Sequence, residues 1–333
     1  MSEASPLPDR AVVADIGATN ARFAVADLAT FELTDIRHGP CAKHATLHEA
    51  MRSYLASLAE PPRHAVLAVA GPVTQEDISL TNLSWSFGKR EFCRAVGFDG
   101  LLVLNDFEAL AHSLPHLAAG ELHQIGGEVP APHAAKLVLG PGTGLGMAGL
   151  VSSGDRFVAV PGEGGHISLG ADNARELDLI ERLRQGRDHV SAERALSGPG
   201  LAALYGAVAA SRGEIAGDIL PNDVIVQGLA GDALAAEALD LFVGWLGRVA
   251  GDAALLFGAR GGVYIGGGIA PKILPVLTNG AFRAAFEAKG RMQAFLAPIP
   301  VYVILAEFAA LKGAAAGLRA ALADSASALI RSS

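Results

Sequence analysis

The sequence predicts an α/β protein made of two related halves. In the first half, short apolar strands alternate with segments of helical periodicity, as where "LLVL" at 101–104 runs through Asn-Asp into a helical pattern. From residue 136, "KLVLGPGTGLGMAGLV" repeats the order of the opening "VVADIGATNARFAVAD", with Gly142 aligned to Gly17 and Gly144 to Thr19. Each stretch has an apolar strand, a glycine-containing turn and a second apolar strand. We therefore expect two α/β halves that face each other.

The remaining elements follow from hydrophobic periodicity and from Gly and Pro signals. Strands are expected within 11–27 (two strands around a turn), 31–41, 63–73, 101–105, 136–151 and the start of 261–274. Helices are expected within 46–60, 106–117, 173–211, 231–257, the end of 261–274 and 311–325. The last of these helices is expected to pack back on the first half.

Composition narrows the class of protein. Of the 333 residues, 51% are hydrophobic and 18% charged, which is typical of a globular chain. The mean hydropathy of +0.35 raises a membrane protein as an alternative, but the least charged windows are too short and too interrupted by Pro or Gly to span a bilayer. The net charge of −8 argues against nucleic acid as the main partner.

The N-terminal residues and the two cysteines indicate in which cellular compartment the protein is found. The start, "MSEASPLPDR", has neither the basic nor the apolar region of a secretory signal. The only cysteines, Cys41 and Cys93, are far apart, which excludes a disulfide framework and a Cys-rich zinc site. We expect a cytoplasmic protein with buried thiols.

The first glycine turn lacks both common nucleotide motifs. After Gly17 the chain continues as a strand, without the further glycines of a dinucleotide site or the Gly-Lys-Ser/Thr of a P-loop. A hairpin whose backbone N–H groups point into the turn can still bind phosphate, with Thr19 and Asn20 as side-chain donors. Asp15 could then hold Mg²⁺, directly or through water. Alone, the stretch fits a plain β-turn equally well.

Two further glycine turns favour the phosphate interpretation. A second hairpin at Gly142, Thr143 and Gly144 could contact the β- and γ-phosphates of ATP from the side opposite the first. The triple glycine Gly266, Gly267 and Gly268 would let the start of a helix approach a nucleoside.

Six motifs in this order identify a family. "DIGATNARFAV", "LNDFEALAHSL", "LGPGTGLG", "PGEGGHISLG", "ERALSGPGL" and "IGGGIAP" resemble those of bacterial ATP-dependent glucokinases, members of the actin-like sugar-kinase superfamily, from about residue 12 to about 312. The resemblance implies two ribonuclease-H-like (actin-like ATPase) domains with a cleft that closes on sugar. It implies a small domain at 1–116 plus 307–333 and a large domain at 117–306. It also implies a homodimer.

The chain departs from related patterns at two places. The family more often has Gly where Ala18 stands, which would matter only if that residue needed a positive φ. Related repressor and kinase proteins have a Cys-rich zinc motif next to the E-x-G-H signature, and this chain lacks it. We therefore expect no zinc, and no zinc-ligand role for His166.

Asp106 is the expected general base. It follows a buried strand, where active-site groups of α/β folds gather, and the resemblance indicates the same residue for taking the proton of the sugar 6-hydroxyl. Asn105 can donate to and accept from sugar hydroxyls. The alternative is that Asn105 or Asp106 only caps the following helix.

Three more polar residues are expected to bind sugar. Glu163 and His166 share a glycine-rich loop, and Glu193 precedes the "SGPG" turn. By resemblance they bind the hydroxyls away from the reacting carbon. The alternatives are a structural hydrogen bond for His166 and a solvated or helix-terminal charge for Glu193. Trp85 and Trp245 are expected in the core or an interface. No spacing to a partner residue singles out the remaining candidates, which are Arg22, His38, His44, His112, His123 and His189.

These expectations combine into a glucokinase: ATP and D-glucose give ADP and glucose 6-phosphate for glycolysis, with Mg²⁺. The phosphate contacts would come from Gly17, Ala18, Thr19 and Asn20 on one side and from Gly142, Thr143 and Gly144 on the other. One alternative is a kinase of mannose or an N-acetylhexosamine. Another is a sugar-sensing regulator, which would need a DNA-binding segment longer than the roughly ten residues before the first strand. A third is an actin-type assembly ATPase.

Overall fold

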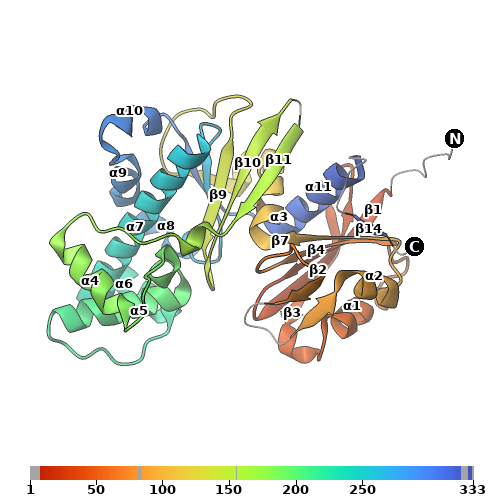
Figure 1. The fold of residues 1–333 in the computed structure, drawn as a ribbon, viewed down its shortest axis with the longest axis horizontal. Coiled ribbons are helices and arrows are strands. Elements are labelled where there is room, and N and C mark those ends of the chain that lie inside the picture. Colours follow the sequence, from red (N-terminus) through yellow and green to blue (C-terminus); the bar gives the residue numbers. More distant parts are fainter. Residues whose placement is uncertain (1–7, 81–84, 155, 324–328, 332–333) are drawn as a thin grey trace. The chain divides into compact units, whose positions relative to one another are not determined.

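The computed structural model describes residues 8–80, 85–154, 156–323 and 329–331. The chain divides into two compact units, which we call unit 1 (Met1–Leu117 and Glu307–Ser333) and unit 2 (Ala118–Ala306). Figure 1 shows that each unit contains a sheet with helices against it. Within the described ranges, no helix is both long enough and apolar enough to cross a bilayer.

Unit 1 is built on a six-stranded sheet in the order β14-β7-β4-β1-β2-β3. The strands β1, β4 and β7 run parallel, and β1, β2 and β3 form an antiparallel meander. Their bounds are β1 (Arg10–Ile16), β2 (Asn20–Asp27), β3 (Leu33–Pro40), β4 (His64–Val69), β7 (Gly100–Asn105) and β14 (Ile330–Arg331). The short strands β5 (Asp77–Ser79) and β6 (Ser86–Gly88) form a separate antiparallel pair.

Unit 2 repeats this topology. Its six-stranded sheet has the order β11-β10-β9-β12-β13-β8, in which the meander β9, β10, β11 corresponds to β1, β2, β3 and the parallel β12 and β13 correspond to β4 and β7. The strands are β8 (Leu122–Gln124), β9 (Lys136–Pro141), β10 (Leu145–Ser153), β11 (Arg156–Gly162), β12 (Val263–Ile265) and β13 (Val301–Ile304). The expected internal repeat of strand topology is therefore confirmed.

Helices cover both faces of the unit 1 sheet. One face packs against α1 (Leu47–Leu55) and α2 (Lys89–Val96) through Phe92, Met51 and Leu67. The other packs against α3 (Asp106–Ser113) and α11 (Ala309–Ala323). Figure 1 shows α11, in blue, lying beside α3 and the strands of the red N-terminal part. The expected return of the last helix to the first half is confirmed, and its residues 324 and 325 lie outside the described part.

In unit 2, the long helix α7 (Ala233–Phe257) is the centre of the core. Its buried Phe242, Trp245 and Leu246 pack with residues of the neighbouring helices and the sheet. Its neighbours are α4 (Ala174–Arg184), α5 (Gly198–Ser211), α6 (Pro221–Leu229), α8 (Leu274–Leu277), α9 (Ala281–Glu287) and α10 (Gln293–Leu296). Trp245 and Trp85 are both buried, as expected.

Two of the helical segments expected in unit 2 are present but interrupted. The segment 173–211 is not continuous, because Gln185 (φ 47°) and Gly186 (φ 77°) turn left-handed and end α4, and α5 begins only at Gly198. After the triple glycine, the chain first forms the 3₁₀ helix η6 (Ala270–Ile273) and then the single turn α8. Both breaks come from backbone conformations that hydrophobic periodicity does not report.

Candidate active site

In unit 1, the first glycine turn is a tight hairpin between β1 and β2. The N–H of Gly17 donates to the carbonyl of Asn20 at 3.0 Å, and Ile16 pairs with Ala21. Ala18 is not among the residues with positive φ, so its methyl group adds no backbone strain. Thr19 and Asn20 are exposed at the tip. Ala18 therefore fits this hairpin without strain, and the two expected side-chain donors are exposed to solvent.

Asp15 is paired with Arg22. The guanidinium donates to Asp15 Oδ2 at 2.8 Å, and the two residues stand directly opposite each other in the β1–β2 register. Burial raises the pKa of Asp15 above its usual 3.8, while the charge and hydrogen bond of Arg22 act in the opposite direction. The sequence analysis found no partner for Arg22. A hairpin register centred on residues 17–20 would have indicated Asp15, since positions 15 and 22 flank that turn symmetrically.

Asp15 fits a single-carboxylate role toward Mg²⁺. Among the described residues, no group of three or more His, Cys, Asp or Glu is placed to hold a metal ion. Mg²⁺ bound with a nucleotide commonly takes only one or two carboxylates and fills its shell with water and phosphate oxygens. Asp15 Oδ2 is bonded to Arg22, and no hydrogen bond to Oδ1 is found in the described part of unit 1. This chemistry fits a magnesium contact through Oδ1.

Asn105 and Asp106 join β7 to α3. Asn105 is the N-cap: its side-chain oxygen accepts from the N–H groups of Phe107 and Glu108, while Glu108 reaches back to the Asn105 N–H. Asn105 thus does cap the helix, and its Nδ2 also donates to the carbonyl of Gly71. Asp106 is the first residue of the helix, and its Oδ1 accepts from the Phe107 N–H at 3.0 Å.

The unit 1 sheet places these groups at one edge. Because β1, β4 and β7 are parallel, their carboxyl ends meet at the same side of the sheet. The hairpin after β1 and Asp106 after β7 therefore lie at the same edge, where ligands of open α/β sheets bind.

In unit 2, the second glycine turn is held by two neighbouring segments. The Gly142 N–H donates to the carbonyl of Gly144 at 2.8 Å, and the carbonyl of Gly142 accepts from the Gly198 N–H at 2.8 Å. The Leu145 N–H donates to Glu193 Oε2, also at 2.8 Å. The "SGPG" turn and Glu193 thus both contact this hairpin directly.

The triple glycine packs against the strand that precedes this hairpin. The Gly266 N–H donates to the carbonyl of Leu139 at 2.8 Å. Gly267 has a φ of 79°, and a Cβ there would lie 2.4 Å from the carbonyl oxygen of Pro141. Only glycine permits this approach, so the hairpin and the triple glycine form one continuous backbone surface.

Glu163 and His166 lie in one exposed loop. Their side chains are 60% and 61% exposed, and Glu163 Oε2 lies 4.0 Å from His166 Nε2. The next residues pair with the segment before Glu193: the Ala192 N–H donates to Ile167, and the Leu169 N–H donates to Val190. Unit 2 therefore brings together the elements that bear the three residues expected to bind sugar.

Arg248 on α7 secures the far end of this loop. Its guanidinium donates to the carbonyl of Gly170 at 2.8 Å and to both carboxylate oxygens of Glu176, and it lies 2.6 Å from Asp172 Oδ2. Its side chain is only 13% exposed. The sequence analysis missed Arg248, because nothing local marks an arginine 78 residues from the loop that it contacts.

Comparison with known proteins assigns the chain to a family. Residues 12–321 match the family model described as Glucokinase. A glucokinase from Aromatoleum aromaticum is 47% identical over 316 residues, which is 94% of this chain and 95% of that protein. The chain belongs to the glucokinase family.

Other relatives extend the comparison. The crystal structure of a glucokinase from an Antarctic psychrotroph superposes with a TM-score of 0.83 at 38% identity, covering 94% of this chain and 99% of that one. A bifunctional protein glk of Burkholderia thailandensis is 43% identical over 315 residues. The present chain covers 49% of that relative, so the glucokinase-family region makes up about half of the larger protein.

Proposed function

We propose that this chain transfers the γ-phosphoryl group of ATP to the 6-hydroxyl of D-glucose, giving ADP and glucose 6-phosphate. The observation that carries the proposal is the family match over residues 12–321, which makes the chain a kinase of glucose. The position of Asp106 at the carboxyl edge of the unit 1 sheet supports the choice of base.

Asp106 takes the proton of the 6-hydroxyl as that oxygen bonds to the γ-phosphorus and ADP leaves. Phosphoryl transfer needs little covalent help from the protein, so the part of Asp106 is that of a positioned base near the attacking hydroxyl. Asn105 stabilises this arrangement chiefly as the helix cap, and its second Nδ2 hydrogen remains available for a sugar hydroxyl.

Glu163, His166 and Glu193 bind the other hydroxyls of the sugar. Glu163 and His166 are exposed within one loop, and their polar atoms can reach neighbouring hydroxyls. Glu193 uses Oε2 for Leu145 and offers Oε1 to the sugar. A site of this kind discriminates among hexoses, because a missing or misplaced hydroxyl would leave these groups unpaired.

The glycine turns bind ATP. In unit 1 the contacts are the backbone N–H groups of the hairpin with the side chains of Thr19 and Asn20. In unit 2 they are Gly142, Thr143 and Gly144 for phosphate, and Gly266, Gly267 and Gly268 for the nucleoside. Asp15 holds Mg²⁺, which when bound neutralises phosphate charge.

A coupled assay for glucose 6-phosphate tests the proposal. Asp106→Asn should lower kcat by at least about a hundredfold, the usual contribution of a general base, while glucose binding persists. Asp240→Asn, on an exposed position of α7, is the matched control and should retain full activity. Normal turnover in Asp106→Asn would remove this residue from the mechanism. Faster phosphorylation of mannose or an N-acetylhexosamine than of glucose would contradict the choice of sugar.

The proposal also covers the oligomeric state of the protein and its location in the cell. We expect a cytoplasmic homodimer, on the basis of the glucokinase resemblance and the two buried free thiols, Cys41 and Cys93. Light scattering of the purified protein in solution measures the mass directly, and the mass of a single 34.1 kDa chain would contradict the dimer.

A further inference from the structure

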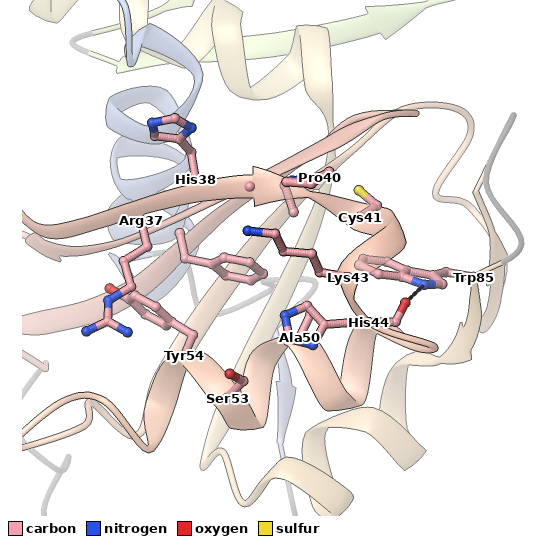
Figure 2. Close-up of a pocket in the computed structure, with 13 residues that line it drawn as sticks. Arg37, His38, Pro40, Cys41, Lys43, His44, Ala50, Ser53, Tyr54 and Trp85 are labelled. Carbon is pink, nitrogen blue, oxygen red and sulfur yellow. Dashed lines mark hydrogen bonds between the residues drawn. The ribbon is translucent and has the colours of Figure 1, made fainter.

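A pocket lies in unit 1, between β2, β3, α1 and the 3₁₀ helix η1 (Cys41–Lys43) (Figure 2). It has a cavity volume of about 180 Å³ and is open to solvent. This is slightly larger than a cavity of about 150 Å³ that can hold a benzene-sized molecule. None of the residues that line it is among those proposed for ATP, glucose or Mg²⁺. We call it the β3 pocket (Figure 2).

The side chains that line the β3 pocket carry positive charge and no negative charge. Arg37 and Lys43 line it, no acidic side chain does, and neither cation forms an ion pair with a described residue. Arg37 stands opposite the buried Phe23 in the β2–β3 register, so it faces the α1 side of the sheet. His38 faces the other side, and Figure 2 shows its ring pointing away from the pocket. In a protein of net charge −8, this is a local site of attraction for anions.

His44 adds an unsatisfied polar group to the same pocket. Its Nδ1 is buried without a hydrogen-bond partner in the described structure, and the carboxylate oxygen Glu49 Oε1 lies 3.7 Å away. Buried polar atoms of this kind are uncommon in folded proteins. Trp85 donates to the carbonyl of His44 at 3.3 Å, which fixes this segment at the pocket wall (Figure 2).

We propose that the β3 pocket binds a phosphate monoester. The planar guanidinium of Arg37 and the ammonium of Lys43 would neutralise the phosphate, and His44 would supply a further hydrogen bond. The volume exceeds that of phosphate alone and leaves room for an organic group. The stacked rings of Phe23 and Tyr54, with centroids 5.2 Å apart, form the apolar floor beneath that group.

The pocket wall is bonded to the hairpin at residues 17–20. The Cys41 N–H donates to the carbonyl of Thr19 at 2.8 Å, and Cys41 Sγ lies 3.6 Å from the carbonyl oxygen of Gly17. A ligand bound in the pocket would therefore alter the hairpin and change the KM for ATP. In return, bound ATP would change the affinity of the pocket for that ligand. This coupling rests on the proposed function, whereas binding itself does not.

Trp85 provides a direct reporter of binding. The chain has two tryptophans, so Trp245→Phe leaves Trp85, at the pocket, as the single tryptophan. Glucose 6-phosphate and inorganic phosphate are titrated into this variant, with chloride at matched ionic strength and with glucose as controls. We expect a saturable change in Trp85 fluorescence with the phosphate compounds only. Calorimetry with the same probes measures binding where the fluorescence does not change.

The double substitution Arg37→Gln with Lys43→Gln locates the site. It should weaken binding of both probes at least tenfold, while Arg90→Gln, an exposed arginine of α2 outside the pocket, should leave it unchanged. Both pocket cations are exposed, so an unaltered melting temperature shows that the fold is retained. Tighter binding of glucose 6-phosphate than of inorganic phosphate supports a contact with the organic group, and equal binding supports the phosphate contact. Equal affinity in the double variant, an equal response to chloride, or no binding by either method would each overturn the proposal.

Discussion

Glu193 Oε2 accepts a hydrogen bond from the backbone N–H of Leu145 at 2.8 Å. The same carboxylate closes off the space above Gly144, where a Cβ would lie 2.4 Å from Oε2. A residue expected to bind sugar thereby also sets the conformation of a turn expected to bind phosphate. This one contact therefore joins the two sites proposed within unit 2.

Gly144→Ala should disturb this coupling. The added methyl group would displace Glu193 and break a charge-assisted hydrogen bond of about 1.5–3 kcal/mol, so the KM for ATP should rise about tenfold or more. Steady-state kinetics measure the change. Gly120→Ala, where a Cβ would meet nothing within 4 Å, is the control. In a Glu193→Ala background the methyl group has room, so fully additive losses in the double variant would contradict this explanation.

Arg22→Gln should make stability depend more strongly on pH. The pKa of Asp15 is already raised by burial, and loss of the Arg22 charge raises it further. A carboxyl group with a raised folded-state pKa stabilises the fold below its unfolded value and loses that contribution as pH rises through the folded value. The variant should therefore match the parent protein near pH 4 and lose about 2 kcal/mol by pH 7.

Urea unfolding between pH 4 and 8 measures this difference. Arg10→Gln is the matched control, because Arg10 and its partner Glu60 are both exposed and such pairs contribute little. A loss in Arg22→Gln that is the same at every pH would show that the charge of Arg22 does not act through Asp15.

Arg248→Met should affect both stability and glucose binding. Removing the guanidinium leaves the carboxylate of Glu176, 12% exposed, without its main partner, which costs about 3–5 kcal/mol in the free energy of unfolding. The loop that bears Glu163 and His166 loses its anchor at Gly170, so the KM for glucose should rise more than kcat falls. Chemical unfolding and a coupled assay give both numbers.

Two variants qualify the Arg248 result. Arg248→Lys keeps the positive charge but loses the two-pronged guanidinium. Its free energy of unfolding and its KM for glucose should lie between those of Arg248→Met and the parent protein. Arg182→Met removes a surface pair with Asp178 on α4 and should cost less than about 1 kcal/mol. An unchanged KM for glucose in Arg248→Met would limit this arginine to a structural role.

Gly313→Ala and Gly206→Ala should change stability with opposite signs. Both glycines lie within helices, where alanine is normally better by about 1 kcal/mol. At Gly206 on α5 a Cβ would meet nothing within 4 Å, so the substitution should stabilise. At Gly313 a Cβ would lie 1.8 Å from the Ala109 carbonyl oxygen, so α11 must move away from α3 at a cost of about 1–3 kcal/mol. Equal shifts in melting temperature would contradict this close packing.

Much of the fold could be predicted because its signals are local. The two hairpins, the strand before Asn105 and the helix α7 follow from apolar periodicity and glycine positions. The break after α4 could not be predicted from periodicity, because the left-handed Gln185 and Gly186 end the helix without any change in hydrophobic pattern. The capping box of Asn105 and Glu108 was present in the sequence, yet a side chain that can cap can also bind sugar.

The sequence by itself determined the family, the repeated strand–turn–strand pattern and the positions expected to do the chemistry, since these depend on residue type and on spacing of a few positions. Only the tertiary structure decided that Asp15 is paired with Arg22, that Glu193 supports the second glycine turn, and that Arg248 holds the loop that bears Glu163 and His166. These contacts depend on which strands and helices become neighbours. That choice is made by burial of the two cores rather than by any local stretch of chain.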